Sequence, residues 1–151
     1  MRLSFLVLLA IGRCYACSCK EPSVQAKRDH AEIIFRGTII ELHDSSKPAD
    51  TAVGFAHDTG KVVVFKVTRV WKGHVGETFE MPGIEETSAC IGFWPDFLKI
   101  GQDLLVYATH FGRSDYLTSI CGNHKPAKDS EKDFTELGPG NEPERSSRRG
   151  K

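Results

Sequence analysis

Segments rich in β-branched and aromatic residues, separated by polar stretches, make up most of the chain. The segments that predict strands are residues 31–42, 61–73, 76–82, 102–108 and 115–121. This content of Val, Ile, Thr and aromatic residues is typical of strands. Gly37, in the middle of the first segment, predicts a bend or a bulge. Residues 73–76 predict a hairpin turn between the second and third strands.

Two short helices are predicted at either end of these strands. Ser23 suits the N-cap of the first. The second covers residues 129–137, where Phe134 and Leu137 share one face and Gly138 ends the helix. The pattern predicts a mainly β fold, an OB-fold five-stranded antiparallel barrel with flanking short helices, and a β-sandwich fits it nearly as well.

The first residues have the pattern of a secretory signal. Arg2 precedes a nine-residue apolar core, residues 3–11, which as a helix spans only about 14 Å and is too short for a bilayer core of about 30 Å. This predicts a signal peptide, with cleavage after Gly12 or after Ala16. Cleavage after Ala16 removes Cys14 and leaves four cysteines, an even set that suits disulfides in an oxidising compartment.

The predicted organisation is therefore a signal peptide over residues 1–16, one domain over residues 17–138 and a tail over residues 139–151. The tail has almost no apolar content and ends in several basic residues, which predicts a disordered basic tail. The product is expected to be secreted and extracellular, because no later apolar run approaches the length of a membrane span.

Composition and charge exclude several functions. The chain has 20 Lys and Arg against 20 Asp and Glu, so it lacks the basic character of a nucleic-acid-binding or membrane-surface protein. The six histidines do not pair at a metal-ligand spacing, and neither a nucleophile elbow nor a glycine-rich phosphate loop is present. We expect a monomer that is not an enzyme, with no catalytic residue and no cofactor of its own.

The four remaining cysteines, Cys17, Cys19, Cys90 and Cys121, allow three disulfide pairings. A bond between Cys17 and Cys19 would be strained, which leaves the two long-range pairings open. Either of these attaches the first residues of the mature chain to the body of the domain. Chain termini are usually mobile, so this double attachment favours a function that needs a rigid terminus.

The Cys-Ser-Cys start after a leader, the segment over residues 65–73, and the two later cysteines resemble the netrin-like module. More narrowly, residues 17–137 resemble the inhibitory N-terminal domain of the tissue inhibitors of metalloproteinases. The resemblance implies the disulfides Cys17–Cys90 and Cys19–Cys121. It also implies that the amine and carbonyl of Cys17 chelate the catalytic zinc of a secreted metalloprotease of the matrix type, with Ser18 in the specificity pocket. The implied protease-binding residues are Cys17, Ser18, Cys19, Lys20, Thr87, Ser88 and Ala89.

The chain departs from that family pattern near the predicted site. Lys20 and Glu21 stand between Cys19 and Pro22, where the family commonly has one residue, and a third disulfide usual in the family has no cysteines here. The main alternative is a secreted netrin-like module that inhibits nothing and binds a receptor or a matrix component. An OB-fold that binds oligosaccharide or nucleic acid is a third possibility, although the neutral charge argues against nucleic acid.

Overall fold

A computed structural model describes residues 19–44, 61–83, 90–111 and 115–145. Within these residues six strands form one antiparallel sheet in the order β3-β2-β1-β4-β5, with β6 also paired to β4. The strands are β1 (Ile33–Asp44), β2 (Lys61–Lys72), β3 (Thr78–Pro82), β4 (Asp103–Phe111), β5 (Asp115–Leu117) and β6 (His124–Pro126). The expectation of a mainly β fold is confirmed.

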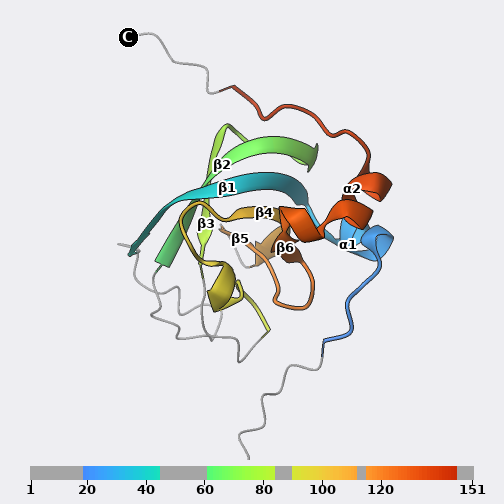
Figure 1. Cartoon of the computed structure of the whole chain (residues 1–151), viewed down its shortest axis with the longest axis horizontal. Helices are drawn as coiled ribbons and strands as arrows, with labels where there is room; N and C mark the ends of the chain where they lie inside the picture. Colours follow the sequence, from blue (N-terminus) through green and yellow to red (C-terminus); the bar gives the residue numbers. More distant parts are fainter. Residues whose placement is uncertain (1–18, 45–60, 84–89, 112–114, 146–151) are drawn as a thin grey trace, which may run out of the picture.

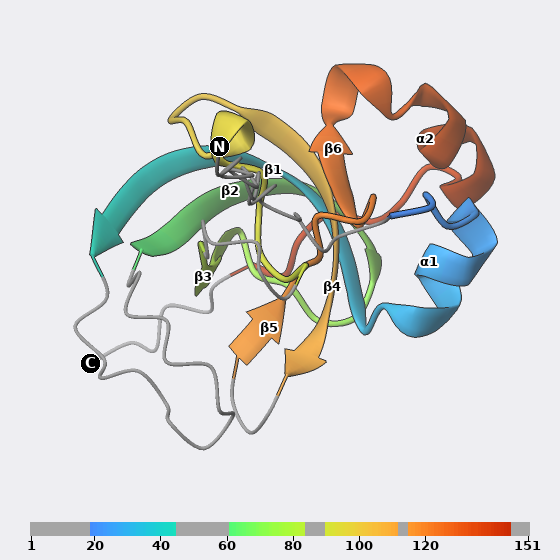
Figure 2. The same cartoon turned by 90° about the horizontal axis from the view of Figure 1, so that it is seen from below.

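The sheet curls into a half-barrel (Figures 1 and 2). β1 contributes to the curl, because its register against β2 shifts at three places, one of them between Arg36 and Gly37. Bulges of this kind bend a strand and increase its twist. A Cβ at Gly37 would lie 3.2 Å from the Lys66 carbonyl oxygen, so the bare glycine lets β2 approach. The predicted bend at Gly37 is confirmed.

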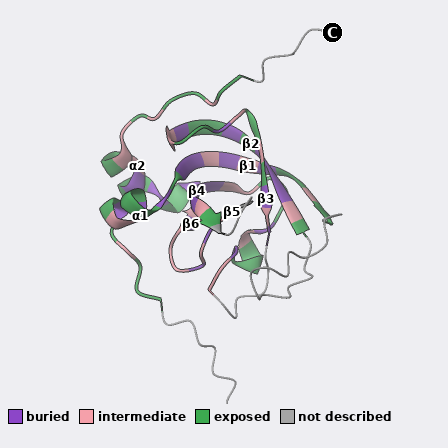
Figure 3. Cartoon of the chain, turned by 180° about the vertical axis from the view of Figure 1, so that it is seen from behind, coloured by how far each residue is buried: buried purple, intermediate pink, exposed green. Residues whose placement is uncertain are grey.

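The inner face of the curl holds the main core, which Figure 3 shows as buried positions along the strands. Phe35 packs edge-on against Phe65 and Phe79, with ring centroids 5.3 Å apart in both pairs. Phe93, from the segment before β4, packs on Phe65 at 6.0 Å and is fully buried. This segment therefore covers the open side of the half-barrel next to the strands.

Two short helices lie side by side on the outer face (Figure 2), α1 (Val24–His30) and α2 (Glu131–Leu137). Ser23 caps α1 by accepting a hydrogen bond from the Ala26 amide, as predicted. Phe134 of α2 stacks on Trp71 of β2, with centroids 5.5 Å apart. Gly138 ends α2 with a φ of 79°, which glycine adopts without strain.

Two strand predictions need correction. The last predicted strand ends at Leu117 rather than at residue 121, because the Thr118 hydroxyl donates to the Tyr107 carbonyl and the chain then turns. At the end of this turn Gly122 has a φ of 87°. β6 was not predicted. It contains only three residues, one of them Pro126, and so carries almost none of the strand pattern.

The prediction of disorder from residue 139 onward is wrong for residues 139–145. The Asn141 amide donates to the Val70 carbonyl at 2.7 Å, the Val70 amide donates back at 2.9 Å, and the Glu144 amide donates to the Val75 carbonyl at 2.9 Å. β3 pairs with β2 only as far as Lys66, so the later part of β2 has a free edge that the tail fills. Residues 146–151 lie outside the described residues.

Candidate functional site

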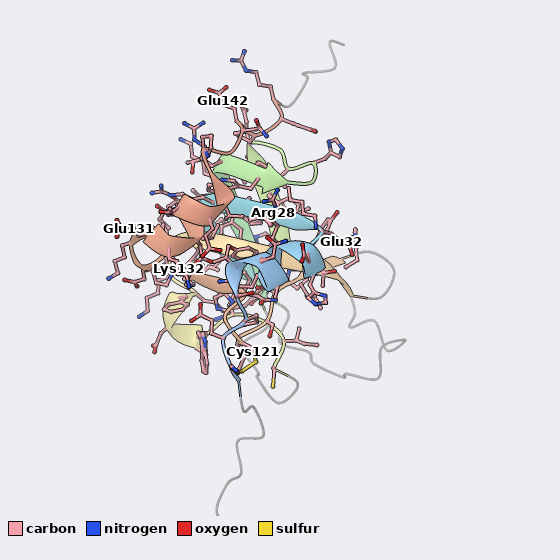
Figure 4. The ribbon with its side chains drawn as sticks, turned by 90° about the vertical axis from the view of Figure 1, so that its right-hand side faces the viewer. Arg28, Glu32, Cys121, Glu131, Lys132 and Glu142 are labelled. Atoms are coloured by element: carbon pink, nitrogen blue, oxygen red, sulfur yellow. A yellow bond between two sulfur atoms is a disulfide. The ribbon has the colours of Figure 1, made fainter. Side chains whose placement is uncertain are left out.

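The Cys19–Cys121 disulfide joins the segment that leads into α1 to the turn after β5, with the two Cα atoms 5.0 Å apart. This confirms one of the two disulfides that the resemblance implied. Figure 4 shows the bond at the end of the fold next to the entry to α1. The bond closes a loop with a sequence separation of 102, for which chain entropy predicts about 4–5 kcal/mol of stabilisation.

Cys90 lies against the same turn. The Ser119 hydroxyl donates to the Cys90 carbonyl at 2.7 Å and accepts from the Cys121 amide at 3.1 Å. The Ile120 amide also donates to the Cys90 carbonyl, at 3.2 Å, and Ile91 forms a β-bridge with Ser119. The structure thus brings Cys19, Cys90 and Cys121 to one rim of the fold.

The remaining predicted contact residues, Cys17, Ser18, Thr87, Ser88 and Ala89, lie outside the described residues, so their roles stay predictions. Cys90 is itself disulfide-bonded, and the expected bond to Cys17 is likewise a prediction. Lys20 is exposed. Ser18 directly precedes Cys19 and Ala89 directly precedes Cys90 in the chain. Cys19, in the first predicted contact segment, and Cys90, directly after the second, are therefore both attached to the same turn.

Next to this rim, four charged side chains form a ring that the sequence analysis did not find. Asp133 of α2 accepts from Lys27 at 2.5 Å and from Lys125 at 3.1 Å. Glu21 lies 2.7 Å from Lys125 and 3.5 Å from Lys27. The Tyr107 hydroxyl donates to Asp133 at 2.8 Å. Carboxylates and ammonium groups alternate around the ring, so each charge faces opposite charges.

The two carboxylates of the ring are ionised at neutral pH. Burial by itself raises the pKa of Asp133, but hydrogen bonds from Lys27, Tyr107 and Lys125 outweigh it and lower that pKa below its usual value. The hydrogen bond from Lys125 lowers the pKa of Glu21. Burial, together with the bond to Asp133, raises the pKa of Tyr107. Tyr107 therefore stays protonated and remains a hydrogen-bond donor to a carboxylate.

A surface depression of about 660 Å³ opens beside the ring, between the start of α1, β6 and α2. Its lining includes Lys20, Glu21, Lys125, Lys132 and Asp133. Three ammonium groups and two carboxylates line it, so the depression carries both signs of charge. It lies directly beside the residues that follow Cys19.

His124 fixes the other side of the rim. Its side chain is buried, and its Nε2 accepts from the Trp94 amide at 3.1 Å. The Trp94 indole donates to the Ile120 carbonyl at 3.1 Å, and Phe93 packs on the imidazole ring with centroids 4.8 Å apart. Burial lowers the pKa of His124 to about 4, so the ring is neutral at pH 7 and its Nε2 is free to accept.

Among residues 19–44, 61–83, 90–111 and 115–145, no three His, Cys, Asp or Glu side chains are grouped to hold a metal ion. The helices in that part of the chain are all too short or too polar to cross a membrane. No family model matches the chain, and a search of curated proteins finds no match either. The functional conclusion therefore depends on this chain's own residues.

Proposed function

We propose that the chain is a secreted inhibitor of zinc metalloproteases, with an OB-type netrin-like domain that presents Cys17 as the first residue of the mature protein. The observation that carries the proposal is the Cys19–Cys121 disulfide on the turn that also holds Cys90. Besides stabilising the fold, an attachment two residues from the proposed terminus holds in place a chain end that would normally move, as an inhibitory terminus requires.

The proposed mechanism is occlusion of the protease cleft rather than catalysis. Catalytic zinc in a protease keeps one coordination position open for water. The α-amino nitrogen and the carbonyl oxygen of Cys17 would occupy the zinc as a five-membered chelate. An α-amine has an ordinary pKa of about 7.7–8.0, so its neutral form is accessible near pH 7. A terminus that is already ordered loses less entropy on binding.

The fold supports an OB-type barrel as the finer description. The sheet is antiparallel, curled and bulged in β1, and Phe93 covers part of its open side. In a closed barrel the sheet has no free edges. In the described residues, edges of the half-barrel are instead covered by the tail along β2 and by β5 and β6, which share one edge of β4.

The test uses a panel of matrix-type metalloproteases with the native secreted protein and a form carrying one additional Ala before Cys17. The additional residue places the Cys17 nitrogen in a peptide bond, which is a poor zinc ligand, and leaves the disulfides intact. We expect the native protein to inhibit and the extended form to lose inhibition at an unchanged Tm. Ser18→Gly keeps the chelate, so it should weaken inhibition to a different extent for each protease.

The alternative, a binding module that inhibits nothing, has one observation in its favour. Ile40 and Ile100 are 45% and 69% exposed and come from segments joined by the hydrogen bond from the Gly101 amide to the Ile39 carbonyl, at 2.8 Å. A contiguous exposed apolar patch marks an interaction surface, and these two side chains would be its first candidates. A native protein that inhibits none of the proteases, or an extended form that inhibits equally well, would favour this alternative.

A further inference from the structure

Two residues attach the segment before α1 to the body of the fold, and a third, Ser23, caps α1. Cys19 is bonded to Cys121, Glu21 pairs with Lys125 at 2.7 Å, and the Ser23 hydroxyl accepts from the Ala26 amide at 3.2 Å. Lys20, between the two attached residues, is exposed.

Glu21 is held by shape as well as by charge. A Cβ at Gly122 would lie 2.9 Å from Cγ of Glu21 and 3.5 Å from Cδ of Pro22. Gly122 also has a φ of 87°, so the turn needs glycine both for its conformation and for this approach. The turn that carries Cys121 is thus fitted to Glu21 in the next position.

Asp133 is the buried anchor of Glu21. Only 1% of Asp133 is exposed, and its two oxygens are shared among the Lys27, Tyr107 and Lys125 donors. Lys125 bridges this fixed carboxylate to Glu21, with Nζ 3.1 Å from Asp133 and 2.7 Å from Glu21. Breaking the contact with Glu21 therefore removes one attachment of the segment and leaves the buried anchor in place.

We propose that Glu21 is a positioning residue, which fixes residues 19–21 in one orientation against the turn after β5. A disulfide alone leaves rotation about its own single bonds. A second attachment two residues away, about 7 Å along an extended chain, removes that freedom. The positioning itself does not depend on the proposed function. Its effect on inhibition does, because the proposed function makes the residues before Cys19 the inhibitory element.

The first test measures the free protein and needs no protease. Backbone amide order parameters of Lys20 and Glu21 are determined by NMR for the native protein, Glu21→Gln and Lys125→Met. We expect values near 0.85 in the native protein and about 0.6 or lower in both variants, the range of flexible backbone. Lys125→Arg, which keeps a cation between the two carboxylates, should restore the native values.

Asp103→Asn is the matched control. It removes the ion pair with Arg36, 2.6 Å long and also partly exposed, which joins β1 to β4 and does not touch residues 19–23. Order parameters of Lys20 and Glu21 should stay at the native values in this variant. Unchanged values in Glu21→Gln, or an equal fall in Asp103→Asn, would overturn the proposal. Glu21→Gln is close in shape to the native residue, so the test does not depend on Lys125→Met folding well.

The second test measures inhibition of a matrix-type metalloprotease. We expect Glu21→Gln to raise the inhibition constant about two- to fivefold at an unchanged Tm, because the lost ion pair is partly exposed and binding then has to order the loosened residues. Asp103→Asn and Lys125→Arg should inhibit like the native protein. A native protein that inhibits nothing refutes the proposed function. The order parameters of the free protein would still show whether Glu21 holds the segment in place. Lower order with unchanged inhibition would refute a positioning role for Glu21.

Discussion

As the pH falls, protonation of His124 should destabilise the fold before the carboxylates are protonated. Nε2 of this histidine accepts from the Trp94 amide at 3.1 Å, and the imidazole packs between the Phe93 and Phe97 rings at 4.8 and 5.7 Å. Protonation would turn Nε2 into a donor that faces another donor, and would place a charge in an apolar site. Lowering the pH therefore acts first on His124 and its contacts at the rim.

The magnitude follows from the pKa. Burial lowers the pKa of His124 from 6.5 to about 4, so between these values the unfolded chain binds a proton that the folded chain does not. Stability consequently rises with pH through this window and is complete above pH 6.5. At about 1.4 kcal/mol per pH unit, the free energy of unfolding should fall by about 2.5 kcal/mol between pH 7.5 and pH 4.5.

The assay is urea unfolding followed by tryptophan fluorescence at several pH values, for the native protein and for His124→Gln. Glutamine keeps a side-chain acceptor and does not titrate, so its stability should change far less over this range. Glu21 and Asp133, whose pKa values are lowered from 4.5 and 3.8, contribute stability that is lost mainly below pH 4.5, the lowest pH of this assay. Native stability that is flat down to pH 4.5, or an equal fall in His124→Gln, would refute the reasoning.

Two further predictions concern the charge ring and the tail. Lys27→Met leaves Asp133 buried with Lys125 and Tyr107 as its donors, and should cost about 3 kcal/mol in urea unfolding. Adding Asp133→Asn should recover much of this cost, and a larger loss in the double variant would contradict it. Truncation after Gly138 removes the backbone bonds to β2 and should cost about 1–2 kcal/mol and lower the Tm by several degrees, whereas truncation after Arg145 should leave the calorimetric Tm unchanged.

Sequence patterns were informative wherever side chains determine the local structure. The strand over Lys61–Lys72 and the cap at Ser23 were predictable, because β-branched content and a capping hydroxyl act within a few residues. Residues 139–145 were predicted to be disordered because they offer no apolar surface. They are ordered instead by backbone bonds to a free strand edge, which any sequence without misplaced prolines can make.

The site was predictable only in part, because most of its contacts join residues that are far apart in the sequence. A resemblance at the cysteines implied the Cys19–Cys121 bond. The ring of charges joins Glu21 and Lys27 to partners about a hundred residues later in the chain, and nothing in the sequence pairs these residues. A lysine in a surface-like helix such as α1 is usually exposed. Only the arrangement of α2 beside α1 shows that Lys27 is buried.

The attachments through the Cys19 disulfide and the Glu21–Lys125 pair both lead to β4. Cys121 belongs to the turn after β5, and Lys125 lies in β6, paired with Leu105. The Tyr107 amide donates to the Asn123 carbonyl at 2.7 Å, and the Thr118 hydroxyl donates to the Tyr107 carbonyl at 3.0 Å, so both ends of the turn are bonded to one residue. Since β4 also pairs with β1 over Ile33 to Thr38, the segment before α1 is attached through a single turn to the most buried strands of the sheet, and its rigidity depends on theirs.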